Sequence, residues 1–318
     1  MLKSQTTPIA LMTGGNGPER FGSLRSGESV INALTSLGVP HDVYDISDLA
    51  GFDPKRYEFA FLTTHGWFGE DGKLQGFLEH QGLAYTGSGV LASAVGMYKP
   101  ICNQLAQSLG LKVPPWTSID FGQTPLIEAR RIVEVVGHKV IAKPVSGGGS
   151  IDAIILDGVD EIVRWLKTMD QNELQFMAQR YVKGLDVTIG IVDGSSGTTV
   201  LPPLSTEYAS SFYDFDTKHD ATKRKHVCPA EIGTPATAAV RSGAERLFSE
   251  LKAEAPFRAD FLVDEEGQAW FLEVNTIPGL SREGNLATMA KAHGITYEDL
   301  IANTIKSARR KEPKGYRQ

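Results

Sequence analysis

The chain has 318 residues, of which 22% are charged, with a formal net charge of -6 and a pI near 5.7. This length predicts two or three domains. The acidic balance argues against a nucleic-acid-binding protein, because binding phosphates along a duplex needs a clustered cationic surface. No apolar run reaches membrane-spanning length and residues 1–12 lack the features of a secretory signal, so we expect a cytoplasmic protein with no membrane partner. Cys102 and Cys228 have neither metal-ligand nor disulfide spacing and are expected to be packing residues.

The first hundred residues alternate between strand and helix patterns. In chain order we expect a strand at 8–15, a helix at 23–38, strands at 41–46 and 57–64, and a helix at 73–80. Such alternation predicts an α/β domain with a parallel sheet, whose ligands bind beyond the carboxyl ends of the strands. The glycine-rich stretches 14–22 and 65–76 should therefore lie at one rim. There, Glu70 and Asp71 are expected to brace the loop and cap the next helix.

The remaining chain divides into a small block rich in strands and a block of hairpins. The first is expected to contain a helix at 98–110, an extended linker at 112–116, helices at 127–137 and 160–169, and strands at 138–144, 151–156 and 173–182. The second should contain two antiparallel hairpins, 185–192 with 198–204 and 257–263 with 269–275. We expect domain boundaries near residues 97 and 182.

The second hairpin carries four polar side chains. By period-two alternation Arg258 and Asp260 share one face of the first strand, and Glu273 and Asn275 share one face of the second. Two carboxylates and an amide oxygen suit Mg²⁺, which usually bridges to substrate phosphates. The alternative is a salt-bridged face in which Arg258 and Asp260 neutralise each other. We favour the metal, because carboxylates in an apolar surround are costly unless a cation lies between them.

A glycine run, SGGGS at 146–150, follows the strand that carries Lys143. Three glycines allow backbone N–H groups to wrap an anion, and the lysine adds a positive charge. The run is not a Walker loop, because the GK[ST] order and the following helix are absent. Alone it fits a flexible turn equally well, but its occurrence with a magnesium-type hairpin favours a phosphate site.

Three stretches resemble the D-alanine–D-alanine ligase family of the ATP-grasp superfamily. GGNGPERFGSLRSG (14–27), the stretch 65–99 that begins HGWFGEDGKLQG, and RADFLVDEEGQAWFLEVNTIPGL (258–280) are similar to the family's motifs, and the similarity runs nearly end to end. The resemblance implies an ATP-grasp fold with a parallel-sheet N-terminal domain at 1–97 and two ATP-grasp subdomains, central at 98–182 and C-terminal at 183–318. It also implies a homodimer through the N-terminal domain.

The activity implied is ATP-dependent ligation of a small amino acid to an amine. An amino-acid carboxylate attacks the γ-phosphate, and a second amine attacks the acyl phosphate, most simply yielding D-alanyl-D-alanine for the cell wall. Because phosphoryl transfer mainly needs positioning and charge stabilisation, no nucleophilic Ser or Cys is required.

The resemblance implies roles for individual residues. For ATP it assigns the phosphates to Lys99, Lys143, Lys218 and the loop with Gly148 and Gly149, the ribose to Asp186, and the adenine to the backbone near Arg180 and Val182. Magnesium, expected as two ions with Mn²⁺ as an alternative, falls to Asp260, Glu273 and Asn275. Glu19 would hold the first ammonium with His65 near that carboxylate, and Arg258 and the N–H of Gly279 would hold the developing oxyanion. Outside the family context, His65 is more simply a structural histidine bonded to a carbonyl.

Several positions on the acceptor side depart from the family pattern. Gly149 replaces a serine, although Ser150 remains beside it as a candidate catalytic residue, and Asn285 with Leu286 replaces the serine–leucine pair that takes the acceptor's carboxylate. Tyr98 replaces an aspartate, and His219 replaces a tyrosine in the loop 210–225. The lysines that the resemblance assigns to ATP keep the family pattern. Because the departures cluster on the acceptor side, the identity of the acceptor stays open.

His219 suggests an ester-forming alternative. In the vancomycin-resistance ligases a histidine in this loop accompanies use of a hydroxy acid as the second substrate. Since histidine titrates near neutrality, His219 could favour a hydroxyl nucleophile at low pH and an amine at high pH. A loop residue that has simply drifted is an equal interpretation.

Three further functions were weighed. A family relative in specialised metabolism would join or cyclise a different small amino acid or hydroxy acid, which the acceptor-side departures favour. A non-catalytic nucleotide-binding protein is disfavoured, because drift would not spare charged residues that are costly to bury. A Rossmann-type dehydrogenase is excluded by the missing G-x-G-x-x-G spacing.

Overall fold

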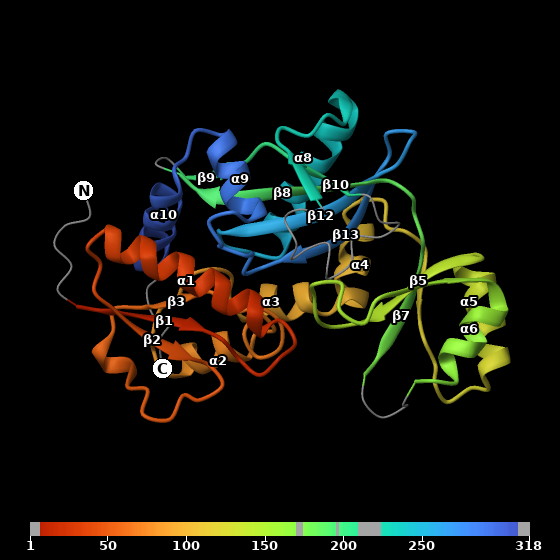
Figure 1. Cartoon of the computed structure of the whole chain (residues 1–318), viewed down its shortest axis with the longest axis horizontal. Coiled ribbons are helices and arrows are strands. Elements are labelled where there is room, and N and C mark those ends of the chain that lie inside the picture. The colour runs from red at the N-terminus through yellow and green to blue at the C-terminus, as the bar shows by residue number, and fades with distance from the viewer. Residues whose placement is uncertain (1–6, 170–173, 195–196, 209–223, 311–318) are drawn as a thin grey trace.

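The computed structural model describes residues 7–169, 174–194, 197–208 and 224–310. Within them the strands form three separate sheets, each covered by helices (Figure 1). The N-terminal sheet lies at one end, the small central-region sheet at the other, and the largest sheet between and above them in the view of Figure 1.

The N-terminal sheet is parallel, as expected, with the order β2-β1-β3. Its elements are β1 (Ile9–Thr13), α1 (Arg20–Ser36), β2 (His41–Asp45), a 3₁₀ turn (Pro54–Arg56), β3 (Ala60–Leu62) and α2 (Lys73–His80). Helix α1 begins three residues before the expected start, because its first turn contains no buried apolar residue to reveal it by periodicity. Glu19 is thereby placed at the N-cap of α1, beyond the end of β1.

The central sheet is antiparallel, with the order β4-β7-β5-β6. Its elements are β4 (Trp116–Ser118), α5 (Pro125–Val136), β5 (Lys139–Pro144), β6 (Ile154–Asp157), α6 (Gly158–Leu166) and β7 (Phe176–Arg180). Strand β6 begins three residues later than expected. The reason is that the glycine turn extends past residue 150: Ser150 and Asp152 have φ of 59° and 57°, in the left-handed region that strands do not use.

The third sheet has the order β11-β10-β8-β12-β13, and β9 also pairs with β8. Its strands are β8 (Leu185–Asp193), β9 (Thr198–Val200), β10 (Leu204–Tyr208), β11 (Arg224–Val227), β12 (Phe257–Val263) and β13 (Ala269–Asn275). Both predicted hairpins, β8–β9 and β12–β13, are confirmed as antiparallel pairs. The helices of this part are α8 (Gly233–Glu250), α9 (Asn285–Ala292) and α10 (Tyr297–Arg310).

Two helices, α3 (Val90–Met97) and α4 (Lys99–Ser108), join the N-terminal and central parts. Both contact β13, and Cys102 is buried in the same apolar cluster as residues of the third sheet. The predicted boundary between residues 97 and 98 falls between these two helices, and the division into three domains remains a prediction. Cys102 and Cys228 are free thiols. None of the described helices is long and apolar enough to cross a membrane.

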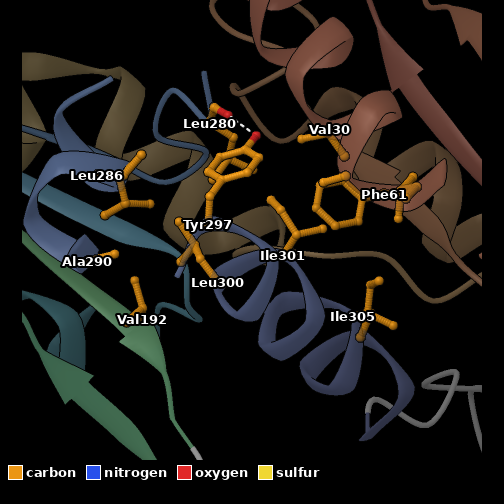
Figure 2. Packing of buried hydrophobic residues seen from close by; sticks show 14 of the residues in the cluster. Val30, Phe61, Val192, Leu280, Leu286, Ala290, Tyr297, Leu300, Ile301 and Ile305 are labelled. Carbon is orange, nitrogen blue, oxygen red and sulfur yellow. Dashed lines mark hydrogen bonds between the residues drawn. The ribbon is translucent and has the colours of Figure 1, made fainter. Parts of the chain in front are cut away.

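The N-terminal sheet and the C-terminal helices share one apolar core. Val30 of α1 and Phe61 of β3 lie in the same buried cluster as Ile301 and Ile305 of α10 (Figure 2). In that cluster the hydroxyl of Tyr297 donates a hydrogen bond of 2.5 Å to the carbonyl of Leu280, as the dashed line in Figure 2 shows. The central sheet instead has a separate cluster made by residues between 119 and 178.

Candidate active site

A cavity of about 390 Å³ lies where the three sheets meet. Its walls come from the start of α1, the glycine turn after β5, the hairpin β12–β13 and the chain that follows β13. Sixteen predicted site residues line it: Glu19, His65, Lys99, Lys143, Gly148, Gly149, Ser150, Arg180, Val182, Asp186, Arg258, Asp260, Glu273, Asn275, Gly279 and Asn285. The fold therefore brings together residues that are up to 266 positions apart, from Glu19 to Asn285.

Three predicted site residues are not among those lining the cavity. The Leu286 side chain is fully buried in the shared core, so only its backbone could serve a ligand. Lys218 and His219 lie outside the described residues. The hypothesis of an ester-forming histidine therefore stays a prediction.

The acidic end of the hairpin β12–β13 contains two opposed carboxylates and also the ion pair between Arg258 and Asp260. Asp260 and Glu273 lie directly opposite each other in the antiparallel pair, as do Arg258 and Asn275. The Arg258 guanidinium bonds Asp260 in a fork, with Nε to Oδ1 at 2.9 Å and Nη2 to Oδ2 at 2.8 Å. Thr188 of β8, which sequence reasoning missed, donates to Oδ1 of Asp260 at 2.5 Å. Although burial opposes its charge, attraction to Asp260 holds the pKa of Arg258 above its usual value.

The donor set at this end fits a hard divalent cation. Two carboxylates and an amide share the face, and the Asp260 and Glu273 side chains are only 19% and 22% exposed. The Lys99 ammonium lies 3.6 Å from Oε2 of Glu273. Carboxylate pairs so sheltered from water need positive charge, which Mg²⁺ supplies through oxygen ligands of this kind.

Lys99 connects the acidic hairpin to the glycine turn. Its backbone N–H donates to the carbonyl of Val145 at 2.8 Å, and its ammonium donates to the carbonyl of Gly147. The turn is further held by the Gly147 N–H, which lies 3.1 Å from the sulfur of Met97. Gly147 and Gly149 have φ of 110° and 68°, which side chains rarely adopt, so the turn requires glycine there.

Glu19 is packed against backbone from two distant parts of the chain. A Cβ added at Gly66 would lie 2.5 Å from one carboxylate oxygen of Glu19, and one added at Gly148 would lie 2.8 Å from the other. Both glycines therefore leave the room in which the carboxylate sits. The Glu19 carboxylate therefore lies directly beside the glycine turn at 146–150.

The end of β7 and the residues after it, 180–182, also line the cavity. The Arg180 guanidinium donates from Nε to the carbonyl of Val136 at 2.9 Å, so that this side chain is directed to helix α5. Among the described residues, the N–H of Val182 meets no acceptor. Asp186 of β8 accepts a hydrogen bond from the hydroxyl of Tyr208. A backbone edge beside a carboxylate is suited to a base and its sugar.

His65 has the contacts of a structural histidine and also lines the cavity. Its Nδ1 lies 3.0 Å from the carbonyl of Ile277, and its Nε2 lies 3.1 Å from the hydroxyl of Ser26. Ser26 Oγ also accepts from the N–H of Leu280 at 3.2 Å, so the hydroxyl proton is free to bond Nε2. Burial lowers the pKa of His65 to about 4, which leaves a neutral ring that donates from Nδ1.

Glu70 does not cap helix α2, and that expectation was wrong. Asp71 accepts from the N–H of Lys73 at 3.2 Å, whereas the Glu70 carboxyl accepts from the N–H of Ile277 at 2.9 Å. The Glu70 side chain is instead buried against the segment after β13. Burial, together with the negative charge of Glu19, raises the pKa of Glu70 to about 8. His65, Ser26 and Glu70 together hold the segment that contains Gly279.

Two antiparallel sheets on either side of one cavity, the first with a lysine and a glycine turn and the second with an acidic hairpin, define the ATP-grasp class of proteins. Residues 105–306 match the family model described as D-ala D-ala ligase C-terminus. A D-alanine–D-alanine ligase of Laribacter hongkongensis is 34% identical over 310 residues, which cover 96% of this chain and 98% of the relative.

Solved structures agree with this class. A D-alanine–D-alanine ligase from Bacillus anthracis gives a TM-score of 0.82 at 28% identity, and covers 96% of this chain and 98% of its own. A structure of a D-alanine–D-alanine ligase from the same organism complexed with ATP gives a TM-score of 0.80 at 26% identity, with the same shares covered. The chain belongs to the D-alanine–D-alanine ligase family.

Proposed function

We propose that this chain is an ATP-dependent ligase that joins the carboxylate of one small amino acid to the amine of a second, most simply giving D-alanyl-D-alanine. The observation that carries this proposal is the single cavity, in which Glu19, the glycine turn and the acidic hairpin meet. The relatives named above are D-alanine–D-alanine ligases, one of them complexed with ATP, which supports the same function.

The nucleotide takes the part of the cavity between the central and third sheets. The Val182 N–H and the backbone of Arg180 contact the adenine, and Asp186 contacts the ribose. Lys99, Lys143 and the N–H groups around Gly148 and Gly149 bind the phosphates, because cations and wrapped N–H groups offset negative charge. Lys218 is expected to join them.

Asp260, Glu273 and Asn275 would hold Mg²⁺, as two ions or with Mn²⁺ in its place. When bound, the metal withdraws charge from the transferring phosphate and from the leaving ADP. Arg258 then has a second task besides pairing with Asp260: with the N–H of Gly279 it stabilises the oxyanion that forms when the amine attacks the acyl carbon.

The first amino acid lies between Glu19 and the phosphates. Glu19 binds its ammonium, so that its carboxylate oxygen faces the γ-phosphate and forms a bond to phosphorus as ADP leaves. The second amine then forms the amide bond to the acyl carbon and phosphate leaves. Ser150 lines the same cavity and is a candidate for orienting the substrate. The neutral His65 ring holds the segment that contains Gly279 through its hydrogen bond to the carbonyl of Ile277.

A change at the acidic hairpin that keeps the side-chain shape but removes the charge tests the assignment. Glu273→Gln should lower ADP release in the presence of D-alanine by at least about a hundredfold, since it removes a carboxylate ligand of the metal. Glu265→Gln, in the exposed turn of the same hairpin where Glu265 pairs with Lys183, should keep the wild-type rate. Equal activity of both variants would place the metal elsewhere.

The second candidate, a relative in specialised metabolism, is favoured by Gly149 and Asn285 at the acceptor side. ADP release measured over single and paired small amino and hydroxy acids separates it from the first, and release with none of them would favour a non-catalytic nucleotide-binding protein. A homodimer and a cytoplasmic location remain predictions. Sedimentation of the purified chain tests the former.

A further inference from the structure

One face of α1 lines the cavity next to the chain that follows β13. Gly22, Arg25 and Ser26 are three and four residues apart, and all line the cavity. Gly279, Ser281, Gly284 and Asn285 line the same part of the cavity, and their segment contacts α1 through the hydrogen bond from the Leu280 N–H to Ser26 Oγ. Glu19, at the N-cap of α1, is the residue that meets Gly148 of the glycine turn, and Gly22, Arg25 and Ser26 follow it along the helix, so this region is a candidate place for the second amino acid.

Arg25 has an ion pair that a ligand could replace. Its Nη2 lies 3.6 Å from Oε2 of Glu283, whose side chain is 81% exposed, while that of Arg25 is 34% exposed. Such a pair with a solvated carboxylate is worth little. Arg258 and Lys99, by contrast, pair with carboxylates that are only 19% and 22% exposed.

A second amino acid in this region brings a carboxylate that needs a cation. Asn285 is neutral, and the Leu286 side chain is buried in the core. Arg258 is held in its fork with Asp260, and the Arg180 Nε is bonded to the end of α5. Arg25 is paired with a residue only two positions before Asn285, so its guanidinium already lies at this loop.

We propose that Arg25 binds the carboxylate of the second amino acid and exchanges Glu283 for it. A guanidinium can bond both oxygens of a carboxylate at once, so the substrate is a better partner than a solvated glutamate at 3.6 Å. The acceptor class is therefore a small molecule with a free carboxylate next to its nucleophile. This inference rests on the proposed ligase function.

A competition between two acceptors tests it. The enzyme is incubated with MgATP, D-alanine and an equal concentration of D-alaninamide, which lacks a carboxylate and can act only as acceptor. Mass spectrometry gives the ratio of D-alanyl-D-alanine to its amide, which reports the ratio of kcat/KM for the two acceptors. Arg25→Ala should lower that ratio by about 10- to 100-fold, the range for a lost charged hydrogen bond.

Companion variants make the result specific. Arg25→Lys should lower the ratio less than Arg25→Ala, and Glu283→Gln should keep or raise it because a competitor for Arg25 is removed. Lys291→Ala removes an exposed positive charge in the last turn of α9, away from the cavity, and should leave the ratio unchanged. A fall with Glu283→Gln equal to that with Arg25→Ala would mean that the pair is structural, and would overturn the inference.

The failure of this inference is distinguishable from that of the function itself. If Arg25→Ala gives the wild-type ratio while ADP release continues, the acceptor's carboxylate lies elsewhere and the ligase function stands. If the wild-type enzyme releases no ADP with any amino or hydroxy acid, the proposed function fails and this inference fails with it.

Discussion

Glu70 shows how a single buried acid can connect two parts of the chain. Its side chain carries a carboxyl into the contact between the N-terminal part and the segment after β13, where it bonds the N–H of Ile277. The residue is only 6% exposed, and burial raises its pKa to about 8. At neutral pH the group is therefore mostly protonated in the folded protein.

This shift predicts how stability depends on pH. The unfolded chain releases the Glu70 proton near pH 4.5, whereas the folded chain keeps it up to about pH 8. Between these values the folded state binds more protons, so the Glu70 contribution to stability falls as pH rises. Glu70→Gln removes this titration. The melting temperature of the wild type, relative to that of the variant, should fall between about pH 5 and about pH 8 and then level off.

The comparison isolates Glu70, because other groups such as His65 titrate in both proteins. Melting should be followed without nucleotide, since bound ATP would add its own pH dependence. A difference in melting temperature that stays constant across this range would mean that Glu70 titrates normally and is not buried against Ile277.

At the scale of an element, helix α1 contains two glycines in opposite situations. A Cβ at Gly22 would meet Cδ2 of His65 at 3.4 Å, an ordinary contact, whereas one at Gly27 would come 2.5 Å from Oγ1 of Thr13. Thr13 belongs to β1, so Gly27 is the point where helix and strand are closest. The two positions separate the helix propensity of glycine from its packing role.

Alanine at these positions should therefore change stability in opposite directions. Gly22→Ala should raise the melting temperature, because glycine inside a helix costs about 1 kcal/mol relative to alanine. Gly27→Ala should lower it, because overpacking costs about 1–3 kcal/mol and exceeds the same propensity gain. Thermal melts of the two variants beside the wild type make the comparison, and shifts of the same sign would show that the packing of α1 on β1 is looser than described.

At the scale of the whole molecule, the apolar clusters do not follow the order of the chain. The first and last parts share a core, with Ile9 and Ala308 in one cluster, while the central sheet is closed by its own residues. We expect two cooperative units, since residues that share a core lose their contacts together.

Hydrogen exchange with core variants tests this division. Ile301→Ala, at a fully buried position of α10, should destabilise the shared core by about 2–5 kcal/mol and speed amide exchange in β1 and β8, with β5 and β7 unchanged. Ile132→Ala in α5, at a position that is 1% exposed, should do the reverse. Faster exchange in both sets of strands with either variant would indicate one cooperative unit.

Elements that are marked by a local pattern of apolar residues, such as the hairpin β12–β13, could be predicted from the sequence. Alternating apolar residues around the turn DEEG predicted the bounds of β12 and β13 to the residue, and the same alternation predicted that Arg258 and Asp260 share a face of β12, while only the structure showed that Asp260 lies opposite Glu273. The starts of α1 and β6 were missed, because a first turn without a buried apolar residue and a residue with positive φ leave no mark in apolar periodicity.

By itself the sequence determined the two hairpins of the third sheet and predicted the glycine turn and the acidic hairpin as binding segments, since motif spacing and strand alternation act over a few positions. Only the tertiary structure decided which distant groups meet: Glu70 with Ile277, 207 positions apart, and Arg25 of α1 with Glu283 of the segment after β13. Those contacts depend on how three sheets pack around shared and separate cores. Such packing is a sum over many weak apolar contacts, and no short stretch of the chain contains it.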